Sequence, residues 1–160
     1  MSIRKDQGMW LIIVGVLAAV VAATVYVILP NLPQASTDLR LGDGVFHATV
    51  ALDDNARTKG LSGATSLSPD QALLMAFPSE DKWGIWMKGM NFPIDILWLN
   101  SNKKVVYIVK NATPDDSTLV TFTPKTSAKY VVELPAGTVE SKTISTDSVA
   151  IFQINEGDIK

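Results

Sequence analysis

The stretch from Trp83 to Asn100 constrains the fold more than any other part of the 160-residue chain. Two strand-like segments, 84–88 and 94–99, flank a Gly-Met-Asn-Phe-Pro turn, and three of the chain's four tryptophans fall inside the stretch. Aromatic side chains at this density fill a core or line a groove, and core packing is the commoner use. The stretch therefore predicts a central β-hairpin, in which alternation turns Trp86 away from its two neighbours and leaves its indole at least half-exposed.

An apolar run from Met9 to Leu29 precedes this region. A helix of that length measures about 31 Å, which matches a hydrocarbon core of about 30 Å, so the run predicts a single transmembrane helix. A cleaved signal peptide is the alternative, although its apolar segment is usually shorter. Arg4 and Lys5 predict that residues 1–8 form a cytoplasmic tail. The rest of the chain is then expected outside the cell membrane. The predicted partner of residues 9–29 is the lipid bilayer.

Composition excludes several classes of function. The formal net charge is −2, whereas nucleic-acid binding calls for a clustered basic face, so no nucleic-acid partner is predicted. Cysteine is absent, which excludes disulfides, thiolate metal sites and thiol nucleophiles. His47, the only histidine, is expected on the solvent side of a strand over residues 45–52, with Phe46 on the buried side. We therefore predict no metal and no cofactor.

The remaining chain divides into a linker at 30–37, a β-rich extracytoplasmic domain at 38–154 and a flexible tail at 155–160. Acidic residues before 55–59 and Gly60 after them predict one short helix. Alternation and turn signals predict further strands at 94–99, 103–110, 128–134 and 148–154, with a weak one at 119–122. The apolar run 72–77 suits either a buried strand or a helical turn. The predicted fold class is mainly β within α+β, a compact antiparallel barrel-like or sandwich-like domain.

Several short elements follow one another in this order: Arg57, Gly60-Leu61, Trp86-Met87-Lys88, Pro93-Ile94-Asp95, Tyr130-Val131-Val132-Glu133-Leu134 and Ala136-Gly137. Their order and spacing resemble the family called domain of unknown function 192, over about residues 45–149. Gly89-Met90 stands where that family usually has Asn-Thr. The resemblance implies a compact β-rich domain, often behind a signal or anchor, and it supplies no established catalytic residues.

Six residues are candidates for a binding site: Arg57, Trp86, Lys88, Pro93, Asp95 and Glu133. Lys88 and Asp95 lie on opposite arms of the predicted hairpin, and we expect them to face one another. A structural ion pair or hydrogen-bond brace is the favoured interpretation of that pair. The alternative is a small site in which Lys88 holds an anion while Asp95 or Glu133 acts as an acid or base.

Three functions stay open at this level. The first is a non-enzymatic module that binds a small molecule, a polysaccharide or an envelope protein. The second is a hydrolase that uses a carboxylate pair, Asp95 and Glu133, with Lys88. The third is a structural accessory subunit of an envelope complex. The sequence lacks a Gly-x-Ser-x-Gly elbow and a phosphate loop, so no catalytic residue is assigned.

Overall fold

A computed structural model of the chain describes residues 14–17, 35–114 and 121–160. The chain divides into two compact units, Met1–Gln34 and Ala35–Lys160. Of the predicted transmembrane run, residues 14–17 are helical and the others lie outside the described residues. Within the described ranges, no helix has the length and apolar character that crossing a membrane requires. The predicted anchor therefore stays a prediction.

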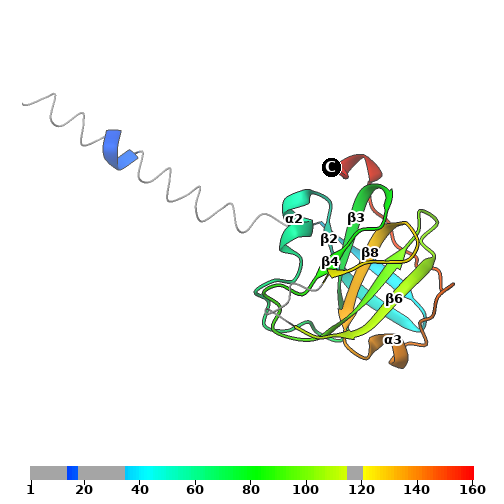
Figure 1. Cartoon of the computed structure of the whole chain (residues 1–160). Helices are drawn as coiled ribbons and strands as arrows, with labels where there is room; N and C mark the ends of the chain where they lie inside the picture. Colours follow the sequence, from blue (N-terminus) through cyan, green and yellow to red (C-terminus); the bar gives the residue numbers. More distant parts are fainter. Residues whose placement is uncertain (1–13, 18–34, 115–120) are drawn as a thin grey trace, which may run out of the picture. The chain divides into compact units, whose positions relative to one another are not determined.

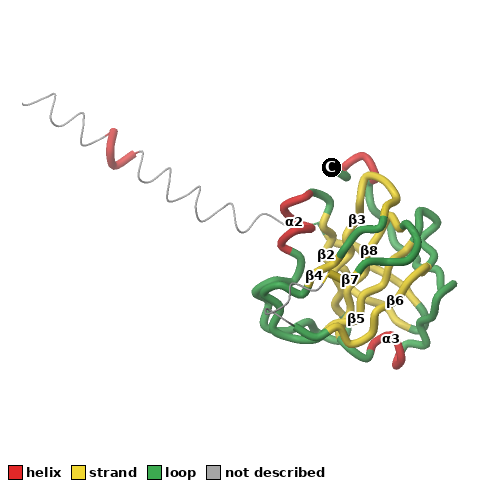
Figure 2. The backbone as a smooth tube through the Cα atoms, in the orientation of Figure 1, coloured by secondary structure: helices red, strands yellow, loops and turns green. Residues whose placement is uncertain are grey.

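The second unit is mainly β, with a few short helices (Figures 1 and 2). The short helices α2 and α3 lie at opposite ends of the sheet (Figure 1). In chain order the elements are β1 (Ser36–Leu41), β2 (Gly44–Ala51), α2 (Asp54–Lys59), β3 (Gln71–Asp81), β4 (Ile85–Trp86), β5 (Ile94–Leu99), β6 (Val105–Ala112), β7 (Thr121–Phe122), β8 (Ala128–Pro135), α3 (Thr138–Ser141) and the 3₁₀ helix η2 (Glu156–Asp158).

Six strands form one sheet in the order β1-β2-β3-β8-β5-β6. All neighbours are antiparallel except β2 and β3, which run parallel. The parallel pair needs a crossover connection, and the segment that contains α2 supplies it. The predicted β-rich class is confirmed, but the described strands do not form a closed barrel.

A bridging segment, residues 148–152, stands where the sequence predicts a last strand. Its residues form only isolated bridges, Ile151 with Arg40 of β1 and Val149 with Lys104 just before β6. Main-chain bonds accompany both bridges, including the one from the Ala150 N–H to the Lys103 carbonyl at 2.9 Å. The segment thus touches both outer strands of the sheet without completing a strand of its own.

The central strands of the sheet are buried on both faces, and a hydrophobic cluster lies on each face. One face carries alternate residues such as Phe46, Leu97 and Leu134, packed with side chains from the last third of the chain. The other carries Met75, Ile96 and Trp98, packed under α2 and the β4–β7 pair. Strand β5 is buried at all six positions, which explains why its sequence is almost continuously apolar.

The predicted central hairpin is wrong. Strand β5 has the predicted bounds and pairs with β6 as expected, but β4 spans only Ile85–Trp86 and pairs with β7 in a separate two-stranded sheet. The sequence between β4 and β5 has the composition of a tight turn, yet it forms a longer loop that folds back over the second cluster through Met87 and Met90. The path of the loop is explained by the burial of its apolar side chains, Met87 and Met90, in that cluster.

Several local predictions are confirmed. Strand β2 buries Phe46 and exposes His47, whose Nδ1 lies 2.9 Å from Asp38 Oδ1. Helix α2 covers the predicted short helix, and the ambiguous run 72–77 is part of strand β3. The sequence gives no warning of α3, which follows the 135–137 turn.

The last residues make more contacts than the predicted flexible tail implies. Glu156, in η2, accepts hydrogen bonds from Lys129 and Tyr130. The bond from Lys129, followed by the one from Tyr130, holds the pKa of Glu156 below its usual value. The Lys160 N–H donates to the Leu52 carbonyl at 2.9 Å, so the segment is fixed beside α2.

Candidate functional site

A pocket of about 370 Å³ opens beside α2, on the face of the sheet that carries Trp98. Volumes of this size suit small organic ligands. Strands β3, β4 and β8 form the floor and one side, and α2 and two loops form the other. The lining residues are Asp54, Arg57, Thr58, Lys59, Gly60, Leu61, Ser62, Met75, Phe77, Gly84, Ile85, Trp86, Met90 and Glu133.

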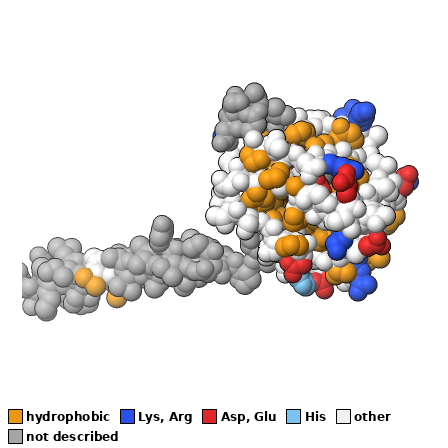
Figure 3. Space-filling view, turned by 90° about the horizontal axis from the view of Figure 1, so that it is seen from below, with side chains coloured by type: hydrophobic (Ala, Val, Ile, Leu, Met, Phe, Trp, Pro, Cys, Tyr) orange, Lys and Arg blue, Asp and Glu red, His pale blue; other side chains and the backbone are white. Residues whose placement is uncertain are grey.

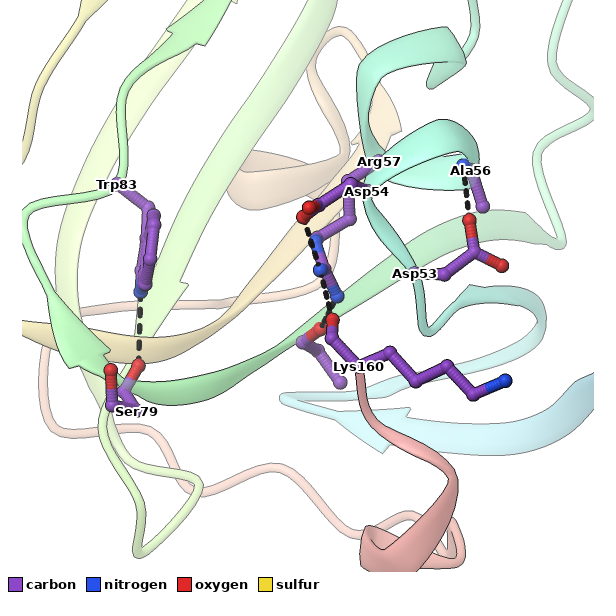
Figure 4. Close-up of polar contacts among 8 residues, drawn as sticks. Asp53, Asp54, Ala56, Arg57, Ser79, Trp83 and Lys160 are labelled. Carbon is purple, nitrogen blue, oxygen red and sulfur yellow. Dashed lines mark hydrogen bonds and ion pairs between the residues drawn. The ribbon is translucent and has the colours of Figure 1, made fainter.

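Helix α2 is fixed at both ends, which positions one wall of the pocket. Asp53 caps its N-terminus by accepting a hydrogen bond from the Ala56 N–H at 2.9 Å (Figure 4). Gly60 ends the helix with a φ of +48°, a conformation that L side chains rarely adopt. A Cβ at Gly60 would also lie 3.3 Å from Met75 Cε, inside the pocket wall.

Two loops complete the mouth of the pocket, and hydrogen bonds tie them together. The Ser62 hydroxyl donates to the Lys88 carbonyl at 2.8 Å, and the Gly63 N–H donates to the Gly89 carbonyl at the same distance. Asn91 adds a third bond, from its side-chain amide to the Ala64 carbonyl. These bonds bring the residues after α2 against the loop that contains Met90.

Arg57 reaches from α2 across the pocket wall, with only 7% of its side chain exposed. Its Nη1 donates to the Ala76 carbonyl and its Nη2 to Asp54 Oδ1, both at 2.7 Å. Nη2 also donates to the main-chain oxygen of Lys160 (Figure 4). The guanidinium carbon lies 5.1 Å from the centre of the Phe77 ring. Arg57 therefore joins the helix, the sheet and the last residue, and its charge is matched by Asp54.

Three tryptophans occupy three different environments. Trp98 is fully buried, and its indole N–H donates to the Trp83 carbonyl at 2.8 Å. Trp83 stacks on Phe77, with ring centres 4.3 Å apart, and its N–H donates to the Ser79 carbonyl (Figure 4). Trp86 lines the pocket with 47% of its surface exposed, which confirms the predicted alternation.

Glu133 is the buried carboxyl group among the residues that line the pocket. It lies on β8 between Leu73 of β3 and Ile96 of β5, and only 3% of it is exposed. Its Oε2 atom is buried and makes no hydrogen bond with any described residue. Burial raises the pKa of Glu133 to about 8, because no neighbouring charge compensates for lost hydration. Most of this carboxyl is protonated at pH 7.

Asp95 and Lys88 do not form the expected ion pair. Asp95 is fully buried and accepts two main-chain hydrogen bonds at 2.8 Å, from Asn111 to Oδ1 and from Val139 to Oδ2. The second bond caps the start of α3, whose own N-cap, Gly137, has no side chain to do so. Lys88 is exposed. Asp95 is thus a structural brace, as the favoured interpretation held, but its partners are backbone amides.

The predicted carboxylate pair is also separated. Asp95 is paired with Leu134 across the sheet, and the next residue of β5, Ile96, is paired with Glu133. Successive side chains of a strand point to opposite faces, so the two carboxyl groups lie on opposite sides of the sheet. A hydrolase of this kind needs both carboxyl groups to flank the same scissile bond, and Asp95 and Glu133 do not have that arrangement.

Comparison with known proteins identifies the family. The sequence model of domain of unknown function 192, described as "Uncharacterized ACR", matches residues 37–151. The chain belongs to this family. The predicted resemblance is thereby confirmed. A UPF0127 protein from Thermococcus gammatolerans is 30% identical over 116 residues, which cover 70% of this chain and 71% of that protein.

Two crystal structures resemble this member of the family. A candidate transcription regulator from Sinorhizobium meliloti 1021 superposes with a TM-score of 0.72 at 25% identity, over 76% of this chain and 97% of that one. A protein of unknown function from Novosphingobium aromaticivorans DSM 12444 gives a TM-score of 0.66 at 19% identity, over 74% and 84% of the two chains. The second likeness shows the fold alone.

The structure brings three of the six candidate residues together. Arg57, Trp86 and Glu133 line the pocket of this family member, whereas Lys88, Pro93 and Asp95 do not. Sequence reasoning missed the apolar lining, chiefly Met75, Phe77, Leu61 and Met90, because apolar residues in strands and loops carry no chemical signature. On the face drawn in Figure 3, hydrophobic side chains form a band, and basic and acidic side chains are interspersed to the right of it and below it.

Proposed function

We propose that the protein binds a small organic molecule in the pocket beside α2, without catalysing a reaction on it. The observation that carries this proposal is Glu133, which lines the pocket and whose buried Oε2 atom lacks a hydrogen-bond partner among the described residues. Leaving a buried polar group unpaired costs about 1–3 kcal/mol, and a ligand in the pocket would supply the missing partner.

The pocket walls support the same proposal. Apolar side chains from β3, β4 and the loops line one part of the pocket, and polar side chains, from α2, Ser62 and Glu133, line the rest, which is the common pattern of a ligand site. Trp86 adds a half-exposed aromatic ring on which a flat or cyclic ligand can stack. Its indole N–H has no hydrogen-bond partner in the described part of the chain, so a ligand can accept from it.

A thermal-shift screen of the full chain in nonionic detergent against a small-molecule library tests the proposal, because a ligand that binds the folded state raises its stability. The variant Thr58→Trp fills the pocket from an exposed position of α2, and Asn55→Trp places the same bulk on that helix away from the pocket. We expect hits that Thr58→Trp abolishes and Asn55→Trp retains. Hits that survive Thr58→Trp would place binding elsewhere.

We further propose that residues 9–29 anchor the protein in the cell membrane and that the pocket domain lies outside. Supporting this are the length of the apolar run and the basic residues before it. Protease treatment of intact cells and of lysed cells is the test. Digestion of the pocket domain in intact cells is the expected result, and protection until lysis would reverse the proposed orientation.

A further inference from the structure

We infer that the ligand carries a protonated amine on an apolar body, with its ammonium group against Glu133. This inference rests on the proposed function, since it concerns the same pocket. It goes beyond that proposal by naming the charge and the chemical class of the ligand.

The arrangement of titratable groups around the pocket favours a cation at Glu133 rather than at any other lining residue. The titratable and charged groups that line it are Asp54, Arg57 and Lys59 from α2 and Glu133 from β8. Arg57 and Asp54 form an ion pair at 2.7 Å, and Lys59 is exposed to solvent. The lining contributed by β3 and β4 carries no charge. Glu133 is therefore the buried titratable group whose Oε2 atom has no partner among the described residues, and a cation is the partner that matches its ionised form.

The same inventory extends to the other elements on this face. Strand β5 contributes Ile94, Ile96 and Trp98, which cannot titrate. Tyr107 of β6 packs against Trp98, with ring centres 5.5 Å apart, and it does not line the pocket. Asp95 lies on the opposite face. No second carboxylate in the described part of the pocket floor competes with Glu133 for a cation.

The pocket walls suit the remainder of such a ligand. Met75, Phe77, Ile85 and Met90 present thioether, aromatic and aliphatic surface, which favours an apolar body. Trp86 offers the face of an indole, the ring that attracts cations best. A neutral hydrogen-bond acceptor would also find a donor in the protonated carboxyl, but a charge-assisted bond in a site removed from water is about twice as strong.

Binding of an ammonium group changes the protonation of the site. The carboxyl O–H bond of Glu133 breaks and its proton passes to the buffer, while the carboxylate oxygen accepts a hydrogen bond from the ligand N–H. Charge is conserved, because a cation enters as a proton leaves. With the pKa of Glu133 at about 8, close to 0.9 proton should be released at pH 7, and the affinity should rise with pH until it levels off above pH 8.

Benzylamine and benzyl alcohol are the probes, since they share one ring and differ in charge. Isothermal titration of the full chain in two buffers of different ionisation enthalpy gives the affinity and the protons released. At pH 8 we expect benzylamine to bind at least about tenfold more tightly than benzyl alcohol. Glu133→Gln should remove this preference, and Glu140→Gln, an exposed position outside the pocket, should keep it.

The other possible results of these titrations also support or overturn the inference. Tighter binding of benzyl alcohol, or benzylamine binding without proton release in the wild type, overturns the inference and leaves the proposed function standing. The proton measurement uses no variant, so it decides even where Glu133→Gln folds poorly. Failure of both probes and of the whole library overturns the proposed function together with the inference. Benzylamine binding that persists in Thr58→Trp shows that the amine binds outside the pocket.

Discussion

Replacing Glu133 with Gln should change how the stability of the domain depends on pH. The folded-state pKa of Glu133 is about 8 and its ordinary value is 4.5. The folded state therefore binds more protons than the unfolded state between these values, and the contribution of Glu133 to stability falls as the pH rises. It is fully favourable below pH 4.5 and is lost progressively until about pH 8. Glutamine keeps the shape and does not titrate.

The magnitude follows from the size of the interval. One pKa unit corresponds to about 1.4 kcal/mol, so the free energy of unfolding of Glu133→Gln should gain about 1.4 kcal/mol on the wild type for each pH unit from 5 to 8. Across the whole interval the gain approaches 5 kcal/mol. Glu133 is almost completely buried, so solvent screening does not reduce this value.

Urea denaturation of the full chain, followed by tryptophan fluorescence at several pH values, measures the effect. The difference between the two proteins matters more than either curve, because other groups titrate in both. Glu140→Gln is the control, since its carboxyl is exposed and its curve should run parallel to that of the wild type. Parallel curves for Glu133→Gln would show that Glu133 ionises normally in the folded protein, which would refute the reasoning.

Three further predictions concern the stability of the fold. Asp95→Ala should lower the free energy of unfolding by about 2–5 kcal/mol, because two main-chain N–H groups lose their acceptor, whereas Lys88→Ala should have almost no effect in the same urea titration. Trp98→Ala should lower the free energy of unfolding by about 3–5 kcal/mol and Trp86→Ala by less than about 1 kcal/mol, as measured by calorimetry. Equal losses would contradict the difference in burial between the two side chains. Gly42→Ala should lower the melting temperature, since its φ is +56° and a Cβ would lie 2.2 Å from a main-chain oxygen, and an unchanged value would exclude that strain.

Local patterns in the sequence predicted most of the elements. Alternation in 45–52 found β2 and its buried face, and the cap and glycine around 55–59 found α2. These signals come from residues close together in the sequence, so they do not depend on how the strands pair. The weak strand predicted at 119–122 contains β7, but its pairing with β4 was missed, because two strands of two residues each carry no pattern that identifies them as partners.

The candidate site was predicted in part for a related reason. Arg57, Trp86 and Glu133 were recognised from their residue types, and the fold brings them to one pocket. The expected pairing of Lys88 and Asp95 assumed that two residues close in sequence across a turn would meet. Asp95 instead binds the main chain at Asn111 and Val139, and such long-range partners depend on strand order, which the sequence did not reveal.

The bridging segment has a consequence for how copies of the protein behave at high concentration. An open sheet presents two rows of unpaired amides to which strands of another molecule can add. Here the main chains of Ile151 and Arg40 exchange hydrogen bonds at 2.9 Å, and the Ala150 N–H donates to the Lys103 carbonyl, just before β6. A few residues of irregular chain therefore occupy main-chain groups at both outer strands of the sheet. We expect this to disfavour the addition of a strand from another copy, although the sheet does not close.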